Sequence, residues 1–481
     1  MKKSFLYLSI ILVSVFANAQ DKQWTLQECV QYALDNNISI QQSELDVEAS
    51  EIDYSDAVGN FLPSVNGDVS VSERTGLNFN PVTNSPQTTT FLSVTGGVNV
   101  GYTLFDGLRN VRRLQRAKVS NLASQYRLSK MKDDISLFVA NSYLQVLTAK
   151  ANLEVLNSQN EVTRSQIERT QALVDGGVLP RGDLLEIQAS NATELQRIAQ
   201  GENQVQIALI SLAQLLLIKD YENFDISEEE FEVIDDGISQ KGISELIAAA
   251  RDNRSEIKIA EQNVELAKKD LQISRGAYYP TLSAFFGYNT RYTNNTSFET
   301  FIDPDNPFST QEIGVVQETG QSVVGQFPNQ SVREVGAQPF VEQLYENDGI
   351  GYGLSLNIPI FNGNATRNNV KRSKINVKRQ EFLLEQASLD LESTVYQAYV
   401  DAKGSLKSFE AAKTALESQE LAYQYAEDRY DVGLTNAFDF SQSKVRYDNA
   451  RIELNRAKYD YIFKIKVLEL YFGVPAAELK F

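Results

Sequence analysis

Residues 350–363 alternate in polarity with a period of two, and this stretch constrains the fold more than any other. Gly, Ser, Asn and Pro fall between its apolar positions. Such a period is typical of a β-strand with one apolar face and one small or polar face. About ten residues of tilted strand cross the hydrocarbon core of a bilayer. The stretch indicates either a membrane-spanning strand or an edge strand of a soluble sheet. Its apolar positions are Ile350, Tyr352, Leu354, Leu356, Ile358 and Ile360.

Three further segments have the same alternating character and lie beside long helical segments. We expect strands at 64–72, 94–105 and 281–292, although Phe285 falls on the polar parity of the last one. A stretch rich in Gly, Asn, Pro and Thr at 75–90 is expected to be a loop. Four such segments favour the membrane interpretation over the soluble one.

Long segments without proline predict unusually long helices. Residues 108–174 contain neither Pro nor Gly, which corresponds to about 100 Å of α-helix. A turn at 175–180 precedes a return helix at 183–218, and residues 366–430 and 438–472 repeat this plan. Such lengths are typical of coiled coils. A further helix is expected over 24–58, capped by Thr25 and Glu28.

The chain contains a twofold internal repeat. Residues 33–37 resemble residues 250–254 at an offset of 217, whereas Phe105-Asp106-Gly107 matches Phe361-Asn362-Gly363 at an offset of 256. The offset changes between the two strands of the second hairpin, where a polar insertion spans about 294–347. Long polar loops between membrane strands usually face the cell exterior. The predicted division is a signal peptide at 1–19, repeat 1 at 20–236 and repeat 2 at 237–481.

Composition excludes several classes of protein. The chain has no His, one Cys (Cys29) and a net charge of −18. Without His, the commonest general base and the commonest zinc ligand are missing. We find no nucleophile–base pair, no metal-ligand cluster and no nucleotide-binding loop, so neither an enzyme nor a cofactor is expected. The negative charge argues against nucleic acid as a partner.

The N-terminus has the pattern of an export signal. Lys2 and Lys3 precede an apolar run at 5–16, and Ala17-Asn18-Ala19 is a small-residue cleavage site. No later stretch has 18 uninterrupted apolar residues, so helical membrane spans are not expected. An exported protein of this kind is periplasmic, secreted or an outer-membrane β protein.

Four strands are too few to close a barrel, because about eight are needed. An open sheet edge is not viable in lipid, so other copies of the chain must complete the sheet. Two copies would give eight strands and three would give twelve. The expected fold class is an α+β membrane protein whose strands join a shared barrel and whose long helices continue it as a coiled-coil tube.

From residue 24 to about residue 474, the chain resembles the TolC family of outer-membrane efflux proteins. The resemblance rests on the order and offsets of several features: the twofold repeat, the strand end at 359–363, and the tip turns at 174–179 and 430–435. It implies a homotrimer with a twelve-stranded barrel in outer-membrane lipid. It also implies a helical tunnel through the periplasm, closed at its tip, that works with a periplasmic adaptor and an inner-membrane pump.

The resemblance places acidic residues at the narrow tip of the tunnel. Asp183 and Asp439 lie six residues after the tip glycines, and Glu186 and Gln442 lie nine after them. In the family, the second repeat carries acidic residues at both positions. Asp439 matches this pattern and Gln442 departs from it. The alternative for Asp183 is helix capping, and for Asp439 it is a solvated helix face.

The resemblance also implies a latch for the closed tip. In the family, a Tyr three residues before the second tip glycine and an Arg two residues after it reach toward the first-repeat Asp. Tyr430 and Asp183 match this pattern, whereas Thr435 replaces the Arg. Arg181 or Arg429 could supply the missing charge. A Tyr-to-carboxylate hydrogen bond contributes about 1.5–3 kcal/mol.

The sequence therefore predicts a passive outer-membrane exit duct for efflux or type I secretion. The alternative is a periplasmic coiled-coil scaffold without channel activity. The residues expected to dock the adaptor are those of the tip turns: Gly176, Gly177, Val178, Leu179, Val432, Gly433 and Leu434.

Overall fold

The computed structural model describes residues 23–228 and 241–474, which form two compact units. The expected signal peptide and the expected boundary between the repeats fall outside the described residues. The helical unit holds described residues within 23–54, 115–269 and 373–474, and the sheet unit holds 55–114 and 270–372. No helix in the described ranges is both long enough and apolar enough to span a membrane.

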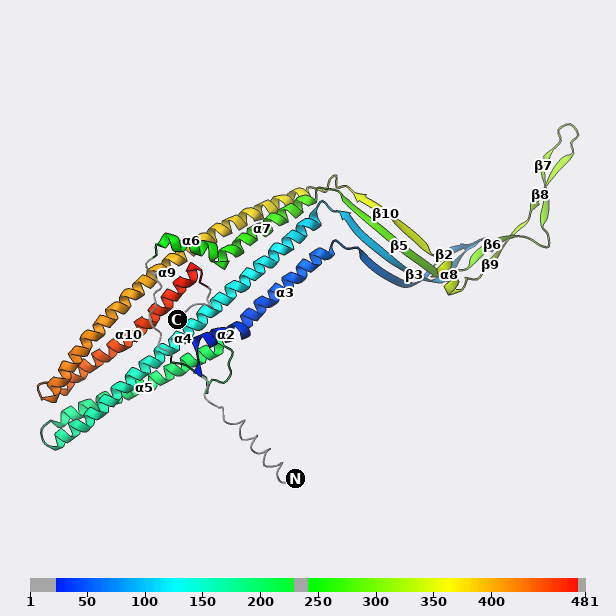
Figure 1. The fold of residues 1–481 in the computed structure, drawn as a ribbon. Helices are drawn as coiled ribbons and strands as arrows, with labels where there is room; N and C mark the ends of the chain where they lie inside the picture. Colours follow the sequence, from blue (N-terminus) through cyan, green and yellow to red (C-terminus); the bar gives the residue numbers. More distant parts are fainter. Residues whose placement is uncertain (1–22, 229–240, 475–481) are drawn as a thin grey trace, which may run out of the picture. The chain divides into compact units, whose positions relative to one another are not determined.

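Two long helical hairpins dominate the helical unit (Figure 1). The first hairpin is α4 (Arg109–Asp175) and α5 (Arg181–Leu215); the second is α9 (Ala365–Asp431) and α10 (Ala437–Phe472). Helices α4 and α9 each have 67 residues, so the two repeats build equal arms. The predicted long helices are confirmed to within a few residues at each end.

Each repeat also contributes a broken pair of shorter helices, and here one prediction was wrong. Residues 24–58 form α2 (Leu26–Asn36) and α3 (Ile38–Gly59) instead of one helix. Asn37 is extended at the break, and its side chain accepts a hydrogen bond from the Ser39 amide at 2.9 Å. Arg254 is extended at the corresponding break between α6 (Ile243–Asn253) and α7 (Ser255–Gly276). The 217-residue offset is thus repeated in the backbone.

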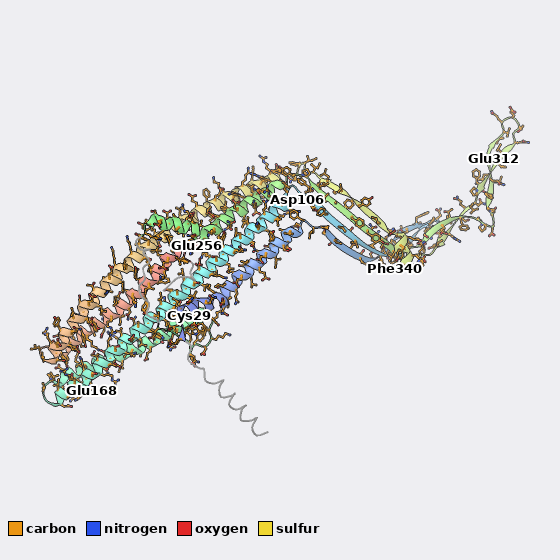
Figure 2. The ribbon with its side chains drawn as sticks, viewed as in Figure 1. Cys29, Asp106, Glu168, Glu256, Glu312 and Phe340 are labelled. Carbon is orange, nitrogen blue, oxygen red and sulfur yellow. The ribbon has the colours of Figure 1, made fainter. Side chains whose placement is uncertain are left out.

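The cap predicted for α2 is present, and the helices pack on two apolar clusters. Thr25 and Glu28 form a reciprocal capping box at distances of 3.1 and 3.2 Å. One cluster surrounds Tyr143 and includes Cys29, which is buried as an apolar residue (Figure 2). A parallel pair of two-residue strands, β1 (Gln23–Trp24) and β4 (Asp225–Ile226), lies against it. The second cluster surrounds Tyr461 and joins α6, α9 and α10.

The sheet unit is an antiparallel four-stranded sheet with the order β10-β5-β3-β2. Its strands are β2 (Ser64–Asn80), β3 (Ser85–Phe105), β5 (Thr281–Thr293) and β10 (Gly349–Asn357). Two predictions need correction. Most of the expected loop at 75–90 is strand, because β2 and β3 pair continuously up to Asn80 and Ser85. The fourth strand ends at Asn357, two residues before Pro359, which has no amide hydrogen to extend the ladder.

The register places apolar side chains on one face of the sheet. Across three strands, Val100 pairs with Phe286 and Phe286 with Tyr352. The neighbouring set on the opposite face is Gly101, Phe285 and Gly353. The Phe285 ring lies over Gly353, where an added Cβ would come within 2.9 Å of it. Phe285 therefore does lie on the polar face of the sheet, as its position in the sequence indicated. Its aromatic ring covers Gly353 there.

The insertion of the second hairpin has secondary structure of its own. Strands β6 (Ser297–Ile302) and β9 (Gln330–Val335) form one ribbon, and β7 (Phe308–Val315) and β8 (Ser322–Pro328) form another. A short helix, α8 (Phe340–Glu346), begins at Phe340 (Figure 2) and returns the chain to the sheet. The Phe340 ring packs edge-on against Tyr292 of β5. The insertion is thus not an irregular loop.

Candidate functional site: the hairpin tips and the interface between the hairpins

The two hairpin tips have the same backbone geometry. Gly177 and Gly433 both have φ of +75°, a conformation that favours glycine. At the first tip the Val178 amide donates to the Leu173 carbonyl, and at the second the Leu434 amide donates to the Arg429 carbonyl, each at 2.8 Å. This hydrogen bond closes the end of a helix on a left-handed residue. The repeat therefore extends to the hydrogen bonds of the tips.

Apolar side chains project from both tip turns into solvent. Val178, Val432 and Leu434 are each about 70% exposed, while Leu179 is half-buried. The glycines Gly176, Gly177 and Gly433 are exposed between them. Exposed apolar groups on a rigid turn can bind a partner.

The acidic candidates lie in the first turns of α5 and α10. Asp183 is half-exposed, and Pro180 is the N-cap of α5, so Asp183 does not cap this helix. Asn436 caps α10 by accepting a hydrogen bond from the Asp439 amide at 2.8 Å. The Asp439 side chain is exposed and stays available for other contacts.

Glu186 and Gln442, which lie nine positions after the tip glycines, are close together in the structure. Glu186 and Gln442 line one groove of about 360 Å³ between α5 and α10, with Phe438 beside them. In the lining of the same groove, the Ser190 and Ser441 hydroxyls are 3.3 Å apart. The single acidic residue of this groove comes from the first repeat.

Tyr430 contacts the first hairpin through a partner that sequence reasoning missed. Its hydroxyl lies 3.0 Å from the Thr170 Oγ1, and its ring stacks on Phe440 at 5.0 Å between centroids. In this structure the Tyr430 hydroxyl is therefore bonded to Thr170 and not to Asp183. Arg169 pairs with Asp431 at 2.6 Å, so the ion pair that links the tips uses neither Arg181 nor Arg429.

A buried polar cluster joins the hairpins at a distance from the tips. Lys444 of α10 donates to the Gln159 carbonyl at 2.7 Å, to the Glu194 carboxylate at 2.9 Å and to the Thr163 hydroxyl. Glu194 also accepts from the Thr163 hydroxyl at 2.8 Å and from the Asn160 amide at 3.2 Å. Three donors and one carboxylate are thus paired inside the protein. Such a pair strongly destabilises a fold when one partner is lost.

Asp448 lies one turn beyond Lys444 on α10 and is 5% exposed. Burial raises the pKa of this carboxyl from its ordinary value of 3.8 to about 7, against the opposing effect of Lys444. Glu194 raises this pKa further, while Arg451 and Arg197 lower it. Burial and the nearby carboxylates of Glu427 and Asp448 also raise the pKa of Tyr423 on α9. No sequence pattern marks this cluster, because its members come from distant positions.

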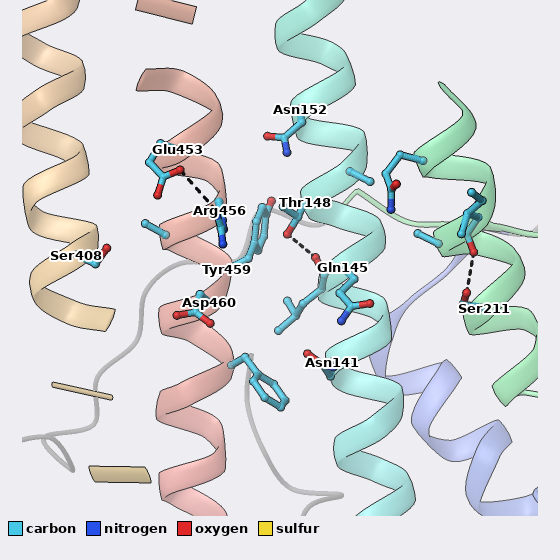
Figure 3. A pocket seen from close by; sticks show the side chains of 17 residues that line it. Asn141, Gln145, Thr148, Asn152, Ser211, Ser408, Glu453, Arg456, Tyr459 and Asp460 are labelled. Atoms are coloured by element: carbon cyan, nitrogen blue, oxygen red, sulfur yellow. Dashed lines mark hydrogen bonds and ion pairs between the residues drawn. The ribbon is translucent and has the colours of Figure 1, made fainter. Parts of the chain in front are cut away.

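A groove between the hairpins is lined by both polar and apolar side chains (Figure 3). It has a volume of about 690 Å³ and is lined mainly by α4, α5 and α10. Asn141, Gln145 and Asn152 of α4 face Arg456 and Asp460 of α10 across it. The first apolar cluster also joins the two hairpins, because it includes Ile462 of α10, and this groove adds polar groups to their interface.

A family model described as "Outer membrane efflux protein" matches residues 29–216 and 246–473. The chain belongs to the outer membrane efflux protein family. It is 24% identical over 420 residues to the outer membrane protein TolC of Vibrio cholerae. The matched region covers 83% of this chain and 80% of that protein. It is 21% identical over 365 residues to the alkaline protease secretion protein AprF of Pseudomonas aeruginosa, covering 75% and 66%.

Solved structures share the fold of this outer membrane efflux protein. The Campylobacter jejuni CmeC outer membrane channel has a TM-score of 0.74 at 16% identity, covering 93% of this chain and 85% of that one. The resemblance to the TolC family and the α+β channel fold are confirmed. This efflux protein lies in the outer membrane, extends into the periplasm and acts as an exit duct. Its family consists of channel proteins that act in efflux or secretion systems, not of enzymes.

Proposed function

We propose that three copies of this outer membrane efflux protein close a twelve-stranded barrel, through which substrates pass passively to the exterior. The exposed apolar face of an open four-stranded sheet carries this proposal. Tyr352 is 79% exposed and Leu354 67% exposed on β10, and Val69 is 78% exposed on β2. Strands β2 and β10 each have one neighbour in the described sheet. Lipid would cover the apolar face, and neighbouring copies would pair with the two edges.

The test measures assembly and conductance of the purified full-length protein. Native mass spectrometry in detergent should give three chains per particle, and planar bilayers should show discrete conductance steps. A monomer without conductance would instead favour a periplasmic coiled-coil scaffold, which would be released by osmotic shock without detergent.

Carboxylates at the tips would make this duct prefer cations. Asp439, Asp183 and Glu186 would surround the narrow end, held shut by contacts such as that of Tyr430 with the first hairpin. Asp439→Asn should lower the cation preference, because it removes one charge per chain from this end. Asp390→Asn, an exposed Asp elsewhere on α9, is the control. An unchanged reversal potential of Asp439→Asn in a salt gradient would rule out this role.

The tip turns would bind a periplasmic adaptor, which connects the duct to an inner-membrane pump. The exposed Val178, Val432 and Leu434 support this proposal, because apolar groups at two equivalent turns offer a repeated docking surface. Energy would come from the pump, because the chain carries no nucleotide-binding loop. Val432→Asp with Leu434→Asp should abolish co-purification of the adaptor but leave conductance intact. Retained co-purification would assign docking to another surface.

A further inference from the structure

All four junctions between strands and helices lie at one end of the sheet. Strands β2 and β5 begin there, at Ser64 and Thr281, and β3 and β10 end there, at Phe105 and Asn357. This follows from the antiparallel order β10-β5-β3-β2, in which neighbouring strands reverse direction. Because the helices extend into the periplasm, this end of the sheet faces the periplasmic leaflet of the membrane.

Large apolar and aromatic side chains are exposed at these junctions. Ile360 is 94% exposed, Phe361 is 81% exposed, and Leu62, Tyr278 and Tyr279 are more than half exposed. They lie within four residues of the strand ends. Aromatic side chains at such a level are typical of the boundary between hydrocarbon and headgroups.

Basic residues follow immediately in the sequence. Residues 107–118 contain five basic and no acidic residues, and residues 362–379 contain six basic and no acidic residues. This concentration stands out in a chain with a net charge of −18. Both runs include the first turns of the two long helices, α4 and α9.

Part of this positive charge has no carboxylate partner. Arg109 and Arg113 lie 3.9 Å from the buried Asp106. In contrast, Arg367 and Lys371 of α9 are exposed, and among the described residues no carboxylate lies within ion-pair distance of either. The two are four residues apart, so they share one face of the helix.

Arg367 also lines a small cavity next to the exposed aromatic groups. The cavity has a volume of about 220 Å³, and the apolar and aromatic residues Tyr278, Ile360 and Phe361 contribute to its lining. Asn364, Thr366 and Arg367 contribute polar groups to the same lining. A surface with an apolar part and an adjacent cation matches a phospholipid, whose acyl chain joins an anionic phosphate.

We propose that the start of α9 and the end of β10 bind an anionic phospholipid of the periplasmic leaflet. Arg367 and Lys371 contact the phosphate and the anionic headgroup, while Ile360, Phe361 and Tyr278 contact the acyl chain. The bound lipid fixes the height of the sheet in the membrane. This inference rests on the outer-membrane location and on insertion of the proposed barrel.

The test uses the full-length protein in detergent, mixed with micelles that contain either phosphatidylglycerol or phosphatidylcholine. Native mass spectrometry counts bound lipid across a titration. We expect phosphatidylglycerol to bind and Arg367→Gln with Lys371→Gln to weaken binding about thirtyfold, because each basic residue near an anionic surface contributes about fivefold. The matched control is Lys403→Gln with Lys407→Gln, an exposed pair with the same spacing on the same helix. The control should stay within about twofold of wild type.

The proposal is overturned by equal binding of both lipids, by equal binding in wild type and Arg367→Gln/Lys371→Gln, or by an equal loss in the control. Displacement of the lipid by inorganic phosphate at about 10 mM would also overturn the proposal, because it would indicate a site for free phosphate. Conductance of each variant is measured in parallel. Loss of lipid binding with normal conductance separates this inference from the proposed duct.

Discussion

Replacing Asp448 by Asn should remove a pH dependence from the interface between the two hairpins. The pKa of Asp448 rises from 3.8 to about 7 on folding because the carboxyl is buried. The native state therefore holds a proton that the unfolded state releases, and stability falls as pH rises from about 4 to about 7. At about 1.36 kcal/mol per pKa unit, the full effect is about 4 kcal/mol. Between pH 6 and pH 8 the same linkage gives about 1.4 kcal/mol, or roughly tenfold in local opening.

Hydrogen exchange measures this opening directly in the full-length protein. After correction for the intrinsic pH dependence of exchange, amides of α10 around residue 448 should lose about tenfold in protection between pH 6 and pH 8. Asp448→Asn should keep its protection constant over this range. Asp460→Asn, an exposed carboxylate on the same helix, should behave like wild type. If Asp448→Asn keeps the wild-type pH dependence, Asp448 is not the titrating group and the reasoning from burial fails.

Three further substitutions test other contacts. Lys444→Met should lower the free energy of unfolding by about 3–5 kcal/mol, because it leaves the buried Glu194 unpaired. Denaturant titration should show that adding Glu194→Met restores most of this lost stability. No recovery of stability in the double variant would contradict the pairing. Gly107→Ala should cost about 2 kcal/mol or more and reduce the yield of folded protein, because φ is +72° and the new Cβ would lie 2.3 Å from the Gly276 carbonyl oxygen; wild-type yield and melting temperature would refute this. Tyr430→Phe should increase hydrogen exchange at the tips a few-fold, since it removes one hydrogen bond of about 1 kcal/mol; unchanged exchange would show that the Thr170 contact does not stabilise the tips.

Sequence reasoning was most successful where a local pattern decides the structure. The absence of Pro and Gly predicted α4 almost to the residue, and the alternation at Ile350 predicted β10 and its apolar face. Sequence reasoning failed where hydrogen bonds to a neighbouring strand decide the structure. The polar residues at 75–90 have weak strand propensity of their own, yet β2 and β3 continue through them because each strand supplies hydrogen bonds to the other. The break at Asn37 was also missed, because the apolar pattern continues on both sides of it.

Sequence alone determined the twofold repeat, the long hairpins, the family and the equivalence of the two tips, because these depend on residues close together in the chain or on constant offsets. Only the tertiary structure decided which side chains meet between the hairpins. Glu194 and Lys444 are 250 residues apart, and so their contact depends on the register of two packed helices. The same packing buries Asp448 and shifts its pKa, an effect of desolvation that no local sequence pattern encodes.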